Sequence, residues 1–118
     1  MQQSLTEAYI HEPSILISVN RTYQDGGNDL YKITRGDWVI GKRREKAKYA
    51  FTVYRGEILE VFSIHSWEPV TTQNPNQQIR NRWRFTGQVA SEMKHYIGQG
   101  VRHYRKRGSQ SPILYVNC

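Results

Sequence analysis

The feature that most constrains the fold is a pair of strand-like runs separated by a two-residue turn. The runs cover Tyr49–Tyr54 and Glu57–Ile64, with Arg55-Gly56 between them. Aromatic and β-branched residues suit a pleated strand, and glycine supplies the positive φ that a tight hairpin turn requires. The second run departs from strict alternation, so we expect a β-bulge near Leu59-Glu60. The sequence therefore predicts a β-hairpin.

Segments on both sides of the hairpin predict further strands, short helices and polar loops. We expect strands at Ser14–Val19, Ile79–Val89 and Ile113–Val116, short helices at Asp29–Ile33, Arg44–Lys48, Ala90–Ile97 and Val101–Lys106, and loops at Asn20–Asn28 and Thr71–Gln78. This order predicts one α+β domain over residues 1–118 with its core in about 14–116. The expected architecture is a small mixed β-barrel with short peripheral helices.

Length and composition restrict the class of protein. A chain of 118 residues is one domain in size, and its three Trp, eight Tyr and three Phe favour a β-rich body. No apolar run approaches the roughly 20 residues of a membrane span, so we expect no membrane partner. The start of the chain lacks the pattern of a secretory signal, and Cys118 is the only cysteine. We therefore expect a cytoplasmic location, in a bacterium or a phage-infected cell.

Positive charge is clustered along the chain. The net charge is +7, with five cations against Glu45 alone in residues 42–48, and eight cations against Glu92 alone in residues 80–107. Clustered positive potential recruits polyanions. A solvated basic face that keeps a small protein in solution explains the same runs without any ligand. We expect a nucleic acid, DNA or RNA, or a nucleotide as the partner.

Each of the three tryptophans stands beside a cation or a turn, in Arg35-Gly36-Asp37-Trp38, His65-Ser66-Trp67-Glu68-Pro69 and Arg82-Trp83-Arg84. An indole can stack on a nucleobase while a neighbouring cation meets phosphate. Two of the tryptophans flank short β-like runs, so we expect them near strand ends. The alternative for any one Trp is a core anchor. The predicted base site comprises Trp38, Trp67, Trp83, Arg35 and Ser66, and the predicted phosphate contacts are Lys42, Arg43, Arg44, Arg82, Arg84, Arg102 and Arg105.

Several segments together resemble the PUA-like superfamily, with its EVE, YTH and ASCH branches as the nearest comparison. They are residues 34–38 (Thr-Arg-Gly-Asp-Trp), residues 50–61, Trp67, and residues 82–87 (Arg-Trp-Arg-Phe-Thr-Gly). The resemblance implies a small β-barrel that binds RNA or reads a modified, flipped base in DNA. It also implies that Trp38 and Trp67 form the walls of an aromatic cage. A clear match to the remaining pocket residues of the EVE branch is missing.

Three other functions remain as alternatives to a non-enzymatic nucleic-acid reader. A nucleotide or nucleotide-type signal could be captured in the same pocket. A small metal-independent ribonuclease could use His65, His95 and His103 as acid and base. A basic face could instead meet an acidic protein. The ten acids are scattered and no histidine pair has zinc-ligand spacing, so the sequence predicts no metal site and no cofactor and favours binding over catalysis.

Overall fold

The computed structural model describes residues 5–19, 30–105, 108 and 111–118. The predicted turn at Asn20–Asn28, with Asp29 and Lys106, lies outside these residues. The elements in chain order are β1 (Ser14–Ser18), α1 (Leu30–Thr34), β2 (Trp38–Val39), the 3-10 helix η2 (Lys42–Lys46), β3 (Tyr49–Tyr54), β4 (Glu57–Thr71), β5 (Gln78–Val89), the 3-10 helices η3 (Ser91–Tyr96) and η4 (Arg102–Tyr104), and β6 (Ile113–Val116).

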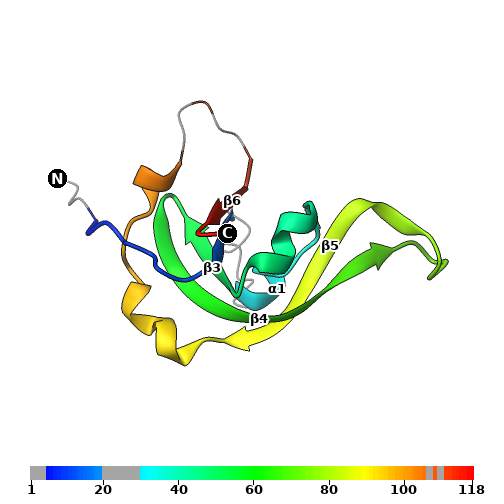
Figure 1. The fold of residues 1–118 in the computed structure, drawn as a ribbon, viewed down its shortest axis with the longest axis horizontal. Coiled ribbons are helices and arrows are strands. Elements are labelled where there is room, and N and C mark those ends of the chain that lie inside the picture. Colours follow the sequence, from blue (N-terminus) through cyan, green and yellow to red (C-terminus); the bar gives the residue numbers. More distant parts are fainter. Residues whose placement is uncertain (1–4, 20–29, 106–107, 109–110) are drawn as a thin grey trace.

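The described strands form one six-stranded mixed sheet in the order β2-β5-β4-β3-β1-β6. β1 runs parallel to β3, and the other neighbouring strands are antiparallel. The sheet is strongly curled into a half-barrel, with short helical turns at its margins (Figure 1). The predicted fold class, a small mixed β-barrel with short peripheral helices, is confirmed.

The predicted hairpin is confirmed in detail. Tyr54 pairs with Glu57, and both turn residues have positive φ, 50° at Arg55 and 81° at Gly56. Such a turn matches the right-handed twist of the strands that it joins. The register then skips at Leu59, because Val53 pairs with Ile58 while Thr52 pairs with Glu60. The expected bulge is therefore present.

The largest differences from the prediction concern the length of β4 and the position of η2. β4 does not end near Ile64 but continues to Thr71, so Trp67 lies inside a strand rather than after the hairpin. The basic turn is a 3-10 helix over Lys42–Lys46, two residues before the expected helix. β4 and β5 extend together as a ribbon whose tip protrudes from the rest of the sheet, while β2 pairs with the base of its end at Arg82 and Trp83 (Figure 1). We call its end, residues 69–83, the arm.

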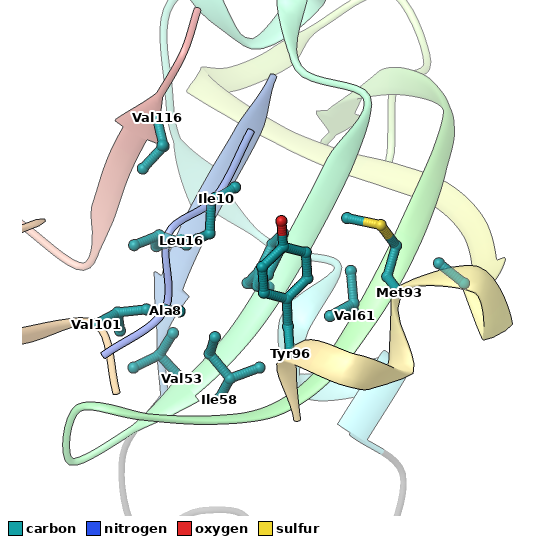
Figure 2. Packing of buried hydrophobic residues seen from close by; sticks show 12 residues of the cluster. Ala8, Ile10, Leu16, Val53, Ile58, Val61, Met93, Tyr96, Val101 and Val116 are labelled. Carbon is teal, nitrogen blue, oxygen red and sulfur yellow. The ribbon is translucent and has the colours of Figure 1, made fainter. Parts of the chain in front are cut away.

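A first core cluster lies between the sheet and the segments that follow β5 or precede β1. Its sheet residues include Leu16, Phe51 and Val61, and Met93 and Tyr96 of η3 pack onto them (Figure 2). Phe51 and Tyr96 meet edge to face with ring centroids 5.4 Å apart. Such contacts add to the free energy that burial of apolar surface contributes. The short helices after β5 therefore cover one face of the sheet.

A second core cluster occupies the other face of the sheet. Alternation along β1 sends Ile15 and Ile17 to this face, whereas Leu16 joins the first cluster. Residues from α1 and from the segment after β2 pack onto it, among them Ile40. Among the described residues, no helix has the length and apolar character needed to cross a membrane.

Tyr96 offers a test of the first cluster. Its hydroxyl donates to Glu12 Oε1 at 2.9 Å. Burial, and then this hydrogen bond, raise the pKa of Tyr96 above its ordinary value of 10.0. The folded protein therefore holds a proton that the unfolded chain releases near pH 10, and the stability that Tyr96 provides below that pH is lost as the pH rises through its raised pKa.

We expect Tyr96→Phe to lower the free energy of unfolding by about 1–2 kcal/mol at pH 7. The difference from the parent protein should shrink above pH 10. Urea unfolding at a series of pH values measures both effects. A difference that stays constant up to pH 11 would contradict the role assigned to this hydroxyl.

Candidate functional site

The structure brings the three predicted tryptophans to one face of the sheet. Trp38 on β2 pairs with Trp83 on β5, and Trp83 also pairs with Pro69 on β4. Trp67 pairs with Phe85 and meets its ring edge at 5.4 Å between centroids. All three indoles are half-buried and pack against the second core cluster. They are therefore core anchors that also reach the surface.

One face of Trp83 is already covered by a cation. The guanidinium carbon of Arg44 lies 3.5 Å from the centroid of the indole ring, and the Arg44 side chain is only 9% exposed. Its Nε also lies 3.0 Å from Glu45 Oε2. Cation–π attraction is strongest when the cation is desolvated. Arg44, predicted to contact phosphate, therefore occupies the position over the ring where a nucleobase would stack.

The indole nitrogens of the cluster differ in their partners. Trp38 Nε1 donates to the Thr34 carbonyl at 2.7 Å, which ties β2 to the end of α1. Trp67 Nε1 is buried and has no hydrogen-bond partner among the described residues. A buried donor without a partner is costly, so this nitrogen lowers the stability of the second core cluster.

The opposite face of the β4–β5 ribbon is polar and internally paired. Arg84 forms a two-pronged ion pair with Asp37, from Nε to Oδ1 at 3.0 Å and from Nη2 to Oδ2 at 3.2 Å. Arg82 Nη1 donates to the Asp37 carbonyl at 3.0 Å. Both arginines were predicted to meet phosphate. Any phosphate that binds Arg84 here competes with the Asp37 carboxylate.

Arg35 and Ser66 of the predicted base site are likewise bound to protein groups. Arg35 Nε donates to the Phe85 carbonyl at 3.1 Å, and its Nη2 lies 3.8 Å from Glu68 Oε1. The Ser66 hydroxyl meets that of Thr86 at 2.9 Å. Because neighbouring strand residues point to opposite faces, Ser66 lies on the polar face and not with Trp67.

The remaining predicted phosphate contacts fall into two places. Lys42 and Arg43 belong to η2, where Lys42 is exposed and Arg43 lies over the Tyr115 ring at 4.5 Å. Arg102 and Arg105 lie far from the tryptophans in the fold, beside a cavity of about 570 Å³. The cavity is lined by Leu16, Ser18, Val53, Arg55, Gly56, Val101, Arg102, Arg105, Gly108 and Leu114.

Arg55 is a lining residue that the sequence analysis missed. The turn Arg55-Gly56 was assigned only a structural role, although a cation at a hairpin turn is exposed and positioned by a fixed backbone. Arg55 carries the same charge as Arg102 and Arg105, and this is the only signal that could have grouped the three. Nothing in the sequence places the Arg55 turn beside η4.

The three histidines proposed for catalysis do not share a site. His103 Nε2 lies 2.7 Å from the Ala8 carbonyl, and His95 stacks on Tyr96 with centroids 4.2 Å apart. His65 lines a separate shallow hollow with Ser63 and Thr86. Within the described part of the chain, these histidines contact other residues and not one another, and no three His, Cys, Asp or Glu side chains gather as a metal site would require.

No family model, curated protein or solved structure matches this chain.

The Arg44–Trp83 stack predicts a measurable dependence of stability on one cation. We expect Arg44→Ala to lower the free energy of unfolding by about 2 kcal/mol, because it removes both the cation–π contact and the packing of the arginine stem. Arg44→Met, which keeps the packing, should lose less. Lys42→Ala is the control, since Lys42 is an exposed cation of the same helix. Chemical unfolding followed by tryptophan fluorescence measures these differences. Equal losses in Arg44→Ala and Lys42→Ala would contradict this account.

Proposed function

We propose that this protein is a non-enzymatic nucleic-acid-binding module that contacts a duplex groove with the arm. The observation that carries the proposal is the arm itself: a protruding two-stranded ribbon whose residues 69–83 contain Arg80 and Arg82 and no Asp or Glu (Figure 1). Residues 72–82 are exposed. A strand pair of this kind fits the major groove of B-form DNA, which is about 12 Å wide.

The side chains of the arm suit base edges as well as phosphate. Its tip and flanks carry amides, namely Gln73, Asn74, Asn76, Gln77, Gln78 and Asn81. Asn and Gln pair with the edge of adenine, and Arg pairs with that of guanine. The tip is also ordered by its own hydrogen bonds, from Thr72 N to Gln77 O at 2.9 Å and from Gln77 N to Asn74 O at 3.0 Å. A preformed tip loses less entropy on binding.

These features favour duplex DNA over duplex RNA, because the major groove of A-form RNA is too deep and narrow for side chains to read. A backbone contact at the base of the arm would come from Arg82 and Arg84. Asp37 holds Arg84 through its carboxylate and Arg82 through its main-chain carbonyl. The carboxylate therefore competes with phosphate for Arg84 and keeps the binding weak and salt-sensitive.

A finer form of the proposal is a PUA-like reader of a flipped or modified base. It is supported by the curled half-barrel and by the three tryptophans on one sheet face. A base entering this cluster has to displace Arg44 from Trp83, and the freed guanidinium is then close enough to meet its phosphate. The unpartnered Trp67 Nε1 is a donor that an incoming acceptor would satisfy only after the cluster opens.

The arm is tested by the salt dependence of binding to a labelled 20-base-pair DNA duplex, followed by fluorescence anisotropy. We expect Arg80→Gln to weaken binding and to lower the slope of log K against log salt by about one, because one phosphate contact is lost. Lys94→Gln is the matched control. Lys94 is exposed on η3, which follows the end of β5 that lies away from the arm (Figure 1).

Equal effects of the two substitutions would show that the charge of the protein as a whole, and not the arm, attracts the duplex. Absence of binding at low salt would overturn the proposal itself. Tighter binding of a single strand or of duplex RNA than of duplex DNA would overturn the assignment to a B-form groove.

A substitution of Asp37 gives a second test, in which duplex binding should become tighter and not weaker. We expect Asp37→Asn to strengthen duplex binding by about threefold to tenfold, since Arg84 loses the carboxylate that competes with phosphate, while Arg82 keeps its bond to the main-chain carbonyl. Glu92→Gln removes an acid from η3 without touching these arginines and should leave affinity almost unchanged. The same anisotropy titration measures both. Weaker binding by Asp37→Asn would mean that the ion pair positions the arginines for the ligand instead of withholding them.

A further inference from the structure

The cavity between β1, the β3–β4 turn, η4 and β6 has the composition of a ligand site. Its volume of about 570 Å³ falls within the range of small-molecule pockets. The floor is apolar, formed by Leu16, Val53, Val101 and Leu114. Three of these residues belong to the first core cluster and are labelled in Figure 2. Polar groups gather instead at the rim.

The rim carries three arginines from separate segments: Arg55 from the turn, Arg102 from η4 and Arg105 just after it. Among the described lining residues there is no carboxylate, and no described acid forms an ion pair with Arg55 or Arg102. Arg55 and Arg102, side by side at this rim, repel each other unless an anion lies near them. A single carboxylate would balance one of these charges, whereas a phosphate monoester carries close to two negative charges at neutral pH.

The fold holds these arginines in place before any ligand arrives. Arg102 Nη2 donates to the Arg55 carbonyl at 3.0 Å, and Arg105 Nη2 donates to Ser18 Oγ at 2.8 Å. Arg102 lies directly against Gly56, where a Cβ atom would stand 2.5 Å from Arg102 Cγ. The backbone of Val101 is fixed by its hydrogen bond to the Gly56 carbonyl at 2.9 Å. Glycine at this turn therefore serves two needs, the positive φ and the room for Arg102.

We infer that this cavity binds a phosphate monoester with a flat apolar body, of the size of a mononucleotide. The guanidinium forks of the rim match the oxygens of phosphate, and the apolar floor takes the ring system. The site is separate from the arm and from the tryptophan cluster, so the inference does not depend on the proposed binding of duplex DNA.

The test is calorimetric titration of the 118-residue chain with adenosine 5′-monophosphate, with adenosine and inorganic phosphate as partial ligands. We expect the monophosphate to bind at least about tenfold more tightly than either partial ligand. Adenosine lacks the phosphate that the arginines would bind, and inorganic phosphate lacks the apolar body that the floor would contact. Arg102→Gln should weaken the monophosphate by about tenfold, and Lys94→Gln, equal in charge but outside the cavity, should not. Leu114→Trp, which fills the floor, should abolish binding. Circular dichroism of each variant shows that it is folded.

Each contrary result overturns the inference in a different way. Inorganic phosphate binding as tightly as the monophosphate would reduce the cavity to an anion site without an organic ligand. Equal losses in Arg102→Gln and Lys94→Gln would reduce it to general charge attraction. Undiminished binding by a folded Leu114→Trp would show that the ligand binds outside this cavity. Absence of monophosphate binding would show that the cavity is not a monophosphate site. Loss of duplex DNA binding in Arg102→Gln, with monophosphate binding intact, would assign this arginine to the polymer backbone.

Discussion

The structure depends on the backbone pairing of β4 along both of its edges. β4 pairs with β3 on one side and β5 on the other, and through them it holds β1, β6 and β2 in the sheet. Two extra residues on β4, Leu59 and His65, break the register and increase the local twist. At the second break, a side chain on Gly87 would collide with the Ser63 carbonyl, so the two backbones can approach only at a glycine. These local features bend a flat ribbon into a half-barrel.

The tryptophan cluster shows how one set of residues can belong to the core and to the surface. Trp38 and Trp83 pack on the second core cluster, and the Arg44 side chain of η2 covers one face of the Trp83 indole. A charge that is so deeply buried is stable only because the ring face and Glu45 compensate for lost hydration. On the other face, Asp37 neutralises Arg84. Cations near the tryptophans are therefore mostly engaged, whereas Arg80 of the arm and Arg55 and Arg102 of the cavity rim form no ion pair with a described acid.

The fold was largely predictable from sequence because its signals are local. The hairpin at Arg55-Gly56 and its bulge follow from a turn glycine and a break in alternation over a few residues. The length of β4 was not predictable in the same way, since Pro69 and the run His65-Ser66 carry weak strand propensity and are held by β5. The tryptophan site was a hypothesis from the cations and turns beside each Trp and from the PUA-like resemblance, and only the register of β2, β4 and β5 places the three rings on one face. The cavity rim was beyond reach, because the turn at Arg55 and η4 lie 47 residues apart and meet only through tertiary packing.

One further consequence follows from the way that β4 leaves the barrel. Its pairing with β3 ends at Ser63, so among the described strands the far half of β4 has no neighbour on that side. An open strand edge of this kind is a template for pairing with another chain, and proteins protect such edges with proline, charge and bulges. β4 has all three within five residues: the bulge at His65, the carboxylate of Glu68 and the missing N–H of Pro69. The same stretch that carries the arm outward thus disfavours edge-to-edge pairing with another strand.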